Sequence, residues 1–384
     1  MVLARSVQRR CARMAGGTRP VVTRLPGCET EEGLRLWEET IKPNPQTDAV
    51  SASQESAAPG VGRNLAFDQQ VIVALLFAVI FLAFSVFLNG FFTVGNLLTL
   101  MRTVSVLGIL GLGMAVVVIG RGIDLSMIAA LAVPTAVVLA VGAQGYGIAF
   151  SLGCGLAFAI AIGVLNGFLV AYAEIPPLFT TLAVGIGIAG IGQSGLFEYE
   201  IIPWPQQLDA IAWIGRGSFA GIPYSVLAFA VATVVVGIFM RRTRLGLFVY
   251  SIGDNTAAAR ITGITVRPMM ILQYVIAASI SLFAGLVLAA SSSNMDTRIF
   301  NLTWIYDVIL VVVLGGIGLS GGRGGVLNVV VGTLLIGTIV NGMTILNVSF
   351  EMQNLIKGMV LLAALSLDSV INPRNEETAQ QGDI

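Results

Sequence analysis

Four amide side chains stand out because they interrupt long apolar stretches of the sequence. They are Asn166, Gln193, Gln273 and Asn341. An amide both donates and accepts hydrogen bonds, so each of these side chains is able to hold a polar molecule or to join two helices. The sequence leaves both roles open for all four residues.

A single acidic residue occupies a polar break in the same apolar region, before the four amides. The segment Gly120 to Ser126 reads GRGIDLS, and Asp124 is the only acid between Asp68 and Glu174. A carboxylate beside apolar helices is costly, which makes it a functional hypothesis. Alternatively, Asp124 or Ser126 accepts hydrogen bonds from the free N–H groups that open the next helix. Both interpretations stay open, because a cap can also be a hinge.

The residue counts exclude several kinds of chemistry. The chain contains no histidine, so histidine catalysis, haem ligation by histidine and histidine zinc sites are excluded. Cys11, Cys28 and Cys154 are too far apart for a CxxC pair. The formal net charge is zero, and no long basic run outside the N-terminal region points to nucleic acid. We therefore expect no metal, no cofactor and no catalytic residue.

One glycine-rich segment imitates a nucleotide-binding signature. Leu319 to Arg323 spells LSGGR, which is close to a motif of ABC ATPases. An ATPase also needs GxxxxGK[ST], and the only lysines, Lys42 and Lys357, do not follow a glycine. The sequence thus predicts that the chain does not bind ATP itself and that this segment is a reversal between two helices.

The composition is that of a membrane protein. Hydrophobic residues make up 56% of the 384 residues, charged residues 11%, and the mean hydropathy is +0.88. We predict an all-α bundle of about ten transmembrane helices, several of them shorter than the roughly 20 residues that a straight span needs. The ten apolar runs are Val71 to Leu88, Val104 to Ile119, Met127 to Val141, Ile148 to Leu169, Leu178 to Gly192, Tyr224 to Met240, Met269 to Ala290, Val308 to Leu319, Leu327 to Asn341 and Leu355 to Leu367.

The distribution of basic residues predicts that both termini are cytoplasmic. Ten spans with a cytoplasmic N-terminus place eight arginines in the inner loops and C-terminal tail, and four basic residues, Arg102, Arg216, Arg298 and Lys357, in outer loops. Residues 1–70 are a polar cytoplasmic extension without its own fold, 71–370 the membrane domain, and 371–384 a short tail.

The polar loop 241–268 contains a predicted helix of about two turns. Asp254 or Asn255 fits its N-cap and Gly263 its C-cap. So short a helix is marginal in water, so it needs a surface to lie on. A cytoplasmic partner supplies that surface in one interpretation, and the membrane surface supplies it in the other.

Four motifs together resemble the ribose-type permease subunits of bacterial ABC importers. They are GIDLS at 122–126, LNGFLVAYAEIPP at 165–177, RRTRLGLFVYSIGDNTAAARITGI at 241–264 and VVVLGGIGLSGGRG at 311–324. The resemblance covers about residues 70–370. It implies a multi-pass protein of the cytoplasmic (inner) membrane that imports a monosaccharide or related polyol. The implied partners are a cytoplasmic ABC ATPase subunit, a solute-binding protein, a second permease subunit and membrane lipid.

The resemblance also implies roles for particular residues. The helix from Asn255 to Gly263 corresponds to the coupling helix that docks on the ATPase. Asp254, Asn255, Ala258, Ala259, Arg260 and Gly263 are accordingly expected to couple to the ATPase. From their residue types and positions, and not from the resemblance, Asp124, Ser126 and the four amides are expected in the translocation path or its gate.

The sequence departs from the family pattern at a few positions. Arg121 stands where the family usually has glycine, and Thr256 and Ala257 replace a common pair of acids. Arg260 thereby becomes the main polar contact expected with the ATPase.

Three alternatives belong to other classes or substrates. An ABC permease for branched-chain amino acids or nucleosides shares the broader architecture. An ion-coupled secondary transporter would need acids or histidines at mid-membrane, and an integral membrane enzyme would need a catalytic constellation. In the external loop Gln193 to Pro223, aromatic and acidic residues either anchor the chain in the headgroups or meet the binding protein.

Overall fold

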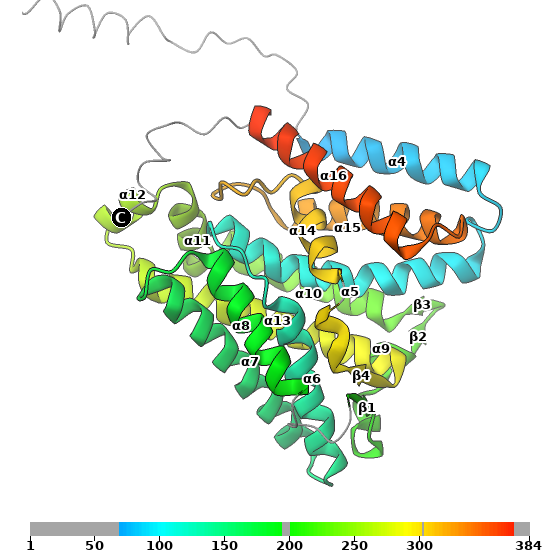
Figure 1. Cartoon of the computed structure of the whole chain (residues 1–384), viewed down its shortest axis with the longest axis horizontal. Helices are drawn as coiled ribbons and strands as arrows, with labels where there is room; N and C mark the ends of the chain where they lie inside the picture. The colour runs from blue at the N-terminus through cyan, green and yellow to red at the C-terminus, as the bar shows by residue number, and fades with distance from the viewer. Residues whose placement is uncertain (1–68, 194–199, 302, 372–384) are drawn as a thin grey trace, which may run out of the picture. The chain divides into compact units, whose positions relative to one another are not determined.

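The computed structural model describes residues 69–193, 200–301 and 303–371 (Figure 1). The predicted extension, residues 1–70, and the predicted tail, 371–384, fall outside this part except at their inner ends, where α4 begins at Gln69 and α16 ends at Ile371. The described residues are mostly helical.

Each of the ten predicted apolar runs lies largely within a helix. These helices are α4 (Gln69–Phe87), α5 (Val94–Ile119), α6 (Met127–Ala143), α7 (Ile148–Ala171), α8 (Pro177–Ile191), α10 (Tyr224–Arg242), α13 (Val266–Ser292), α14 (Trp304–Leu314), α15 (Val326–Ile345) and α16 (Phe350–Ile371). The predicted class, a polytopic helical membrane bundle, is confirmed.

The helices differ in their ability to cross a bilayer. Six of them, α4, α5, α7, α10, α13 and α15, are long and apolar enough to do so. Helices α6, α8 and α14 have 17, 15 and 11 residues. At 1.5 Å per residue, α14 is about 17 Å long, which is shorter than a hydrocarbon core of about 30 Å. The bundle therefore combines full spans with shorter helices that depend on neighbours.

Two helix ends differ from the sequence prediction. Helix α5 begins ten residues before Val104, because Thr93 caps it by accepting from the N–H of Asn96. Helix α14 ends at Leu314, since Gly315 is followed by Gly316 in the left-handed region at φ 91°. Arg102 therefore lies within α5. Lys357 lies within α16, which begins at Phe350. Their assignment to outer loops was wrong.

Short elements connect the long helices. They are η2 (Gln206–Ile211), α9 (Trp213–Arg216), α11 (Arg244–Asp254), α12 (Thr256–Ile261) and η3 (Thr297–Asn301). Two small antiparallel sheets join β1 (Ile201–Pro203) to β4 (Asn294–Asp296), with Ile202 opposite Met295, and β2 (Ser218–Phe219) to β3 (Ile222–Pro223).

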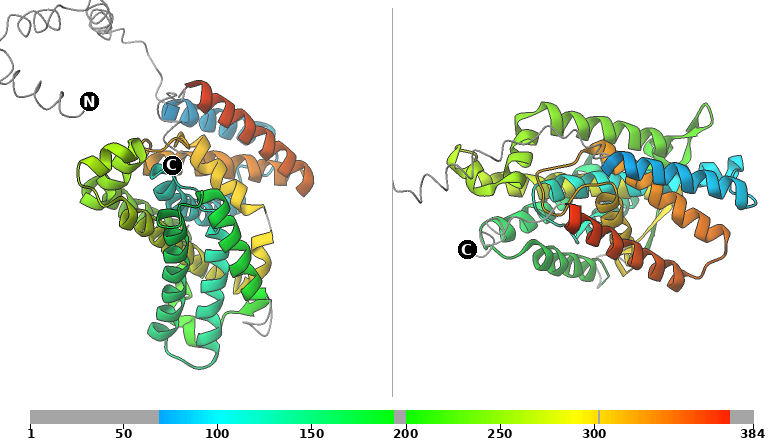
Figure 2. Two further views of the ribbon diagram at one scale, coloured as in Figure 1. Left: turned by 60° about the vertical axis from the view of Figure 1, so that its left-hand side comes forward. Right: turned by 90° about the horizontal axis from the view of Figure 1, so that it is seen from above.

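Helices α5 and α13 form the centre of the bundle. Of the most apolar part of α5, 89% is buried, compared with 6% for α4. Helix α13 packs against α7, α5 and α6, whereas α4 contacts α15 and α16 contacts α14 (Figure 2). The core therefore lies around α5, α6 and α13, and α4 is peripheral.

Glycines bring the backbones of α7 and α13 into direct contact. A Cβ on Gly163 would lie 2.5 Å from Cα of Val275, and one on Gly167 would lie 2.4 Å from Cα of Ile271. Small residues allow this approach in membrane bundles. The pair Gly163 and Gly167 thus sets the distance between these helices.

We predict that Gly163→Ala lowers the free energy of unfolding by about 1–3 kcal/mol, because the added methyl group overpacks a backbone contact. The matched control is Gly153→Ala on the same helix, where a Cβ meets nothing within 4 Å. The control keeps or raises stability, since alanine favours a helix. Thermal unfolding of the purified variants in detergent measures both, and equal melting temperatures would contradict the prediction.

Candidate functional site

Three of the predicted site residues form one buried hydrogen-bonded chain. Oδ1 of Asp124 accepts from the N–H of Ser126 at 2.9 Å and from its hydroxyl at 2.5 Å. The hydroxyl oxygen of Ser126 accepts from Nδ2 of Asn166 at 2.7 Å. All three residues are at most 1% exposed. The polar break after α5 is thereby joined to the C-terminal part of α7.

Hydrogen bonds of the connection between α5 and α6 hold these three polar side chains in place. Arg121 adopts a left-handed conformation at φ 65°, and the N–H of Gly122 donates to the carbonyl of Val117. Thr181 of α8 accepts from the N–H of Leu125 at 3.0 Å and donates to the carbonyl of Ile123. The turn is therefore held against α8, and Asp124 within it is buried.

Neither Asp124 nor Ser126 caps α6 in the predicted way. Ser126 is the N-cap residue but makes no side-chain bond to the N–H groups of α6. Asp124 accepts only from Ser126, so it closes a local turn just before the helix. Asp124 thus orients Ser126, and Ser126 in turn orients Asn166.

Helix α13 supplies two more polar residues beside this turn. Gln273 and Tyr274 are each 1% exposed. A Cβ on Gly120 would overlap the amide of Gln273, and one on Gly122 would lie 2.7 Å from the hydroxyl of Tyr274. The turn and α13 therefore meet at these two glycines. We name Asp124, Ser126, Asn166, Gln273 and Tyr274 the polar cluster.

Several atoms of the polar cluster are free to bind a polar group. Within the described residues, Oδ2 of Asp124, Oδ1 of Asn166, Nε2 of Gln273 and the hydroxyl of Tyr274 are buried without a hydrogen-bond partner. They include donors and acceptors, which is the combination that a hydroxylated solute or water can satisfy.

Burial also changes the pKa of the acidic residue in the polar cluster. Burial raises the pKa of Asp124 to about 6, while the hydrogen bonds from Ser126 lower it. The residue lies in the connection between α5 and α6, outside both helices. The carboxyl group of Asp124 therefore binds a proton more readily than an exposed aspartate does.

The predicted helix of loop 241–268 is present as α12. Oδ1 of Asn255 accepts from the N–H of Ala258 at 2.9 Å, so Asn255 is the N-cap. Asp254 is the last residue of α11 instead. After α12, Gly263 is left-handed at φ 89°. The N–H of Gly263 donates to the carbonyl of Arg260, and the N–H of Ile264 donates to the carbonyl of Ala259. This is a Schellman ending, which Gly263 permits.

The two faces of α12 differ. Ala259 is 3% exposed and packs against the chain itself, whereas Ala258 and Arg260 are exposed. Sequence reasoning missed Ile261, which is 87% exposed at the end of the helix. An isolated branched apolar residue within a polar loop was the available signal. Ala258, Arg260 and Ile261 form the exposed face of α12.

Two predicted amides lie apart from the polar cluster. Gln193 is exposed just beyond the end of α8. Asn341 of α15 forms a reciprocal amide pair with Asn96 of α5, with distances of 3.0 Å and 2.9 Å. The structure thus places Asn341 in a bond between helices. Asn96 escaped notice because the predicted apolar run began only at Val104.

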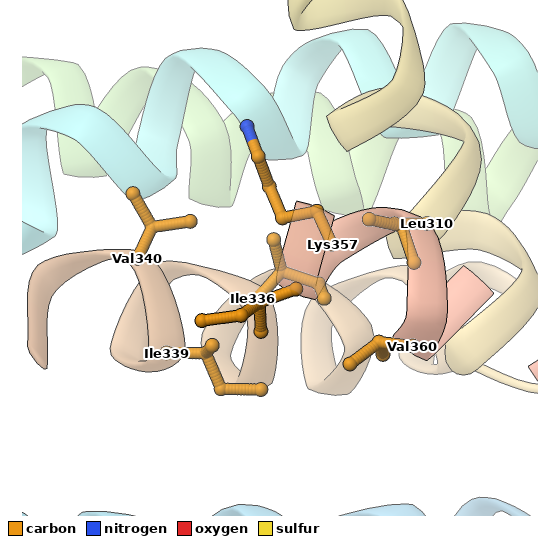
Figure 3. A pocket seen from close by; sticks show the side chains of 7 residues that line it. Leu310, Ile336, Ile339, Val340, Lys357 and Val360 are labelled. Carbon is orange, nitrogen blue, oxygen red and sulfur yellow. The ribbon is translucent and has the colours of Figure 1, made fainter. Parts of the chain in front are cut away.

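A buried ion pair between α14 and α16 was not predicted either. Nζ of Lys357 lies 2.9 Å from Oδ1 of Asp307, and their side chains are 9% and 15% exposed. Figure 3 shows Lys357 among the apolar side chains of a small pocket between α14, α15 and α16. Lys357 also lines a larger cavity of about 510 Å³, together with Tyr306 and Asn354.

The described residues contain no group of three or more cysteine, aspartate or glutamate side chains that is able to hold a metal ion. The carboxylate of Asp124 bonds to Ser126, and that of Asp307 pairs with Lys357. The chemistry of this interior is hydrogen bonding and ion pairing.

Comparison with known proteins gives consistent relatives. The ribose import permease protein RbsC of Bacillus subtilis is 32% identical over 71% of this chain and 84% of its own length. The galactofuranose transporter permease protein YtfT of Escherichia coli is 30% identical over 72% and 80%. The L-arabinose ABC transporter permease protein AraH of Azospirillum brasilense is 30% identical over 80% and 89%. No solved structure matches.

A family model covers most of the chain as well. The model described as "Branched-chain amino acid transport system / permease component" matches residues 96–365, which include all described helices from α6 to α15 and most of α5 and α16. This match agrees with the resemblance that the four motifs indicated. The chain therefore belongs to this family of ABC-transporter permease components.

Proposed function

We propose that this chain is the membrane subunit of an ABC importer for a monosaccharide or related polyol. Relatives named for ribose, galactofuranose and L-arabinose support a sugar substrate. The observation that carries the mechanism is the exposed face of α12 on a helix that leads, through Gly263 and Ile264, directly into α13. Helix α13 carries Gln273 and Tyr274 to the polar cluster. Movement of α12 thus reaches buried polar groups through one short connection.

The energy source in this proposal is a separate cytoplasmic ATPase. The sequence has no GxxxxGK[ST] motif, so the chain itself is a transport subunit and not an enzyme. Asp254 and Asn255 delimit α12, Ala259 anchors it, and Gly263 ends it. Ala258, Arg260 and Ile261 are the residues that face the ATPase. An ATP-driven partner supplies the preference for one state that any conformational cycle needs.

The polar cluster is proposed as part of the inner gate of the path. Asp124, Ser126, Asn166 and Gln273 lie near the same end of the bundle as α12, since Arg121 contacts Asp254. Gln193 and Asn341 remain proposed path residues, with Asn341 acting through its pair with Asn96. Selectivity is shared with a solute-binding protein, so the path itself needs few polar groups.

The remaining partners and the topology follow from the same proposal. A second permease subunit completes the path, and membrane lipid surrounds the exposed apolar residues. The arginines of loop 241–268 support a cytoplasmic location for α12. Both ends of the chain are then cytoplasmic, with 1–70 and 371–384 flanking the membrane domain 71–370. A permease for branched-chain amino acids or nucleosides is the second candidate. The family description names branched-chain amino acids, whereas the named relatives are permeases for sugars.

The exposed face of α12 generates a direct test. Ile261→Asp and Arg260→Glu should each reduce copurification of the ATPase subunit encoded with this gene, and lower ATP-dependent sugar uptake about tenfold or more. The reason is that truncating or reversing a central contact of an interface costs about 2 kcal/mol or more. Affinity pull-down from detergent extracts measures the first effect. Uptake into right-side-out vesicles that contain trapped ATP and are supplied with the solute-binding protein measures the second.

The matched control for Ile261 is Leu247→Asp, because Leu247 is also exposed (53%) but lies on α11. This control should keep the ATPase bound. Normal ATPase binding by both α12 variants would remove this helix from the interface.

The polar cluster generates a second test. Ser126→Ala leaves Nδ2 of Asn166 buried without its acceptor, which costs about 1–3 kcal/mol of stability and misplaces the amide. We expect slower ATP-dependent uptake with ATPase binding unchanged. The control is Ser151→Ala, since Ser151 is equally buried but bonds only to Gly147 next to its own helix. Equal uptake by the two variants would show that the cluster is purely structural.

A further inference from the structure

The C-terminal ends of α5 and α11 are in direct backbone contact. A Cβ on Gly253 would overlap the carbonyl oxygen of Ile119, the last residue of α5. Gly253 is also one residue before the end of α11. Only glycine permits this approach without a shift of the backbone. Two helix termini of the same kind therefore meet here.

This meeting is electrostatically unfavourable on its own. The C-terminal end of a helix carries about half a negative charge, spread over carbonyl groups that lack helical partners. Ile119 and Asp254 both present such carbonyls. Like charges repel, so the contact needs donors or a cation between the two ends.

Arg121 and the glycine-rich turn supply these donors. The guanidinium of Arg121 donates to the carbonyl of Asp254 at 3.0 Å and to the carbonyl of Ser320 at 2.9 Å. The N–H of Gly322 donates to the carbonyl of Ile119 at 2.8 Å. One arginine therefore connects the end of α11 with the turn 315–325, which in turn holds the end of α5. Such charge-assisted bonds are stronger than neutral ones.

The backbone of Arg121 shows that its side chain serves this contact at a cost. Its φ of 65° lies in the left-handed region, where glycine is favoured and other residues are strained. A glycine would form the same turn without strain. The turn itself thus has no need of an arginine, whereas the two helix ends do.

We propose that Arg121 is a positioning residue, an electrostatic clamp that holds the C-terminal ends of α5 and α11 and the turn 315–325 as one unit. The proposal deepens the proposed function and rests on it for one part: through the clamp, movement of α12 reaches the connection 120–126 and the polar cluster. Asp124 is three residues from Arg121, and α12 begins two residues after Asp254. The clamp itself is a property of this chain alone.

The clamp is tested first in the full chain without any partner. Spin labels are placed at Ala258 and Arg323, both exposed, after replacement of Cys11, Cys28 and Cys154. The chain is reconstituted in nanodiscs. Pulsed electron–electron double resonance then measures the distribution of distances between the label on α12 and the label on the turn 315–325. We expect a single narrow distance distribution for the chain that keeps Arg121. The width of the distribution should be at least about twofold greater for Arg121→Met and Arg121→Gly, because both variants lose the charged hydrogen bonds.

Two comparisons separate the clamp from a merely structural role. Arg242→Met is the matched control, since Arg242 is an exposed arginine at the end of α10 for which no hydrogen bond or ion pair occurs within the described residues; its distribution should stay narrow. Arg121→Gly should keep or raise the melting temperature while broadening the distribution, because it relieves the strained turn. A narrow distribution for either Arg121 variant would overturn the clamp.

The transmission part is tested in the complex with its ATPase and binding protein. Vesicles are assayed with radiolabelled ribose, L-arabinose and galactose, and the sugar that the original chain transports is used for the variants. The Arg121→Gly variant should bind the ATPase and hydrolyse ATP as before. It should move about fivefold less sugar per ATP, because it lacks the charged hydrogen bonds that pass the movement of α12 to the connection 120–126. A normal ratio of sugar to ATP would overturn transmission. If the unaltered chain bound no ATPase, the proposed function would fail, while the spin-label distances would still decide the clamp.

Discussion

Direct backbone contact between α7 and α13 is the constraint on which the rest of the interior depends. Gly163 and Gly167 leave no side chain between the two helices, so the position of α13 is fixed by its neighbour rather than by flexible side chains. Because α13 also packs against α5 and α6, its residues Gln273 and Tyr274 are placed beside the turn that holds Asp124. The polar cluster is therefore a product of helix packing.

Local features of the structure were predictable from the sequence because short-range physics determines them. Apolar runs indicated the ten helices, since a backbone in lipid has to satisfy its own hydrogen bonds. The cap at Asn255 and the ending at Gly263 followed from side-chain and backbone preferences that act over three or four residues. The resemblance of four motifs to sugar permeases then gave the family, which the comparisons confirmed.

Features that join distant parts of the chain were not predictable in the same way. Ser126 and Asn166 were each selected as polar residues in apolar surroundings, but their bond joins positions 40 residues apart. The pair Asn96 and Asn341 spans 245 residues, and Lys357 and Asp307 are 50 residues apart. Such pairs depend on the rotation of each helix about its axis, which a weakly amphipathic sequence does not specify. Arg102 and Lys357 were misplaced for a related reason, since charged residues within helices resemble loop residues when only composition is considered.

The connection 120–126 joins the contact between α5 and α11 to the polar cluster. The connection 120–126 is seven residues long, and it carries Arg121 near one end and Asp124 and Ser126 at the other. Thr181 and Val117 fix its middle by hydrogen bonds, so the segment has little slack to absorb a displacement. A shift of α11 against α5 therefore changes either the bonds of Arg121 or the geometry of Asp124. Since Asp124 orients Ser126, and Ser126 orients Asn166, the second outcome rearranges the polar groups between α7 and α13. A rigid short connection thus transmits motion that a long flexible loop would dissipate.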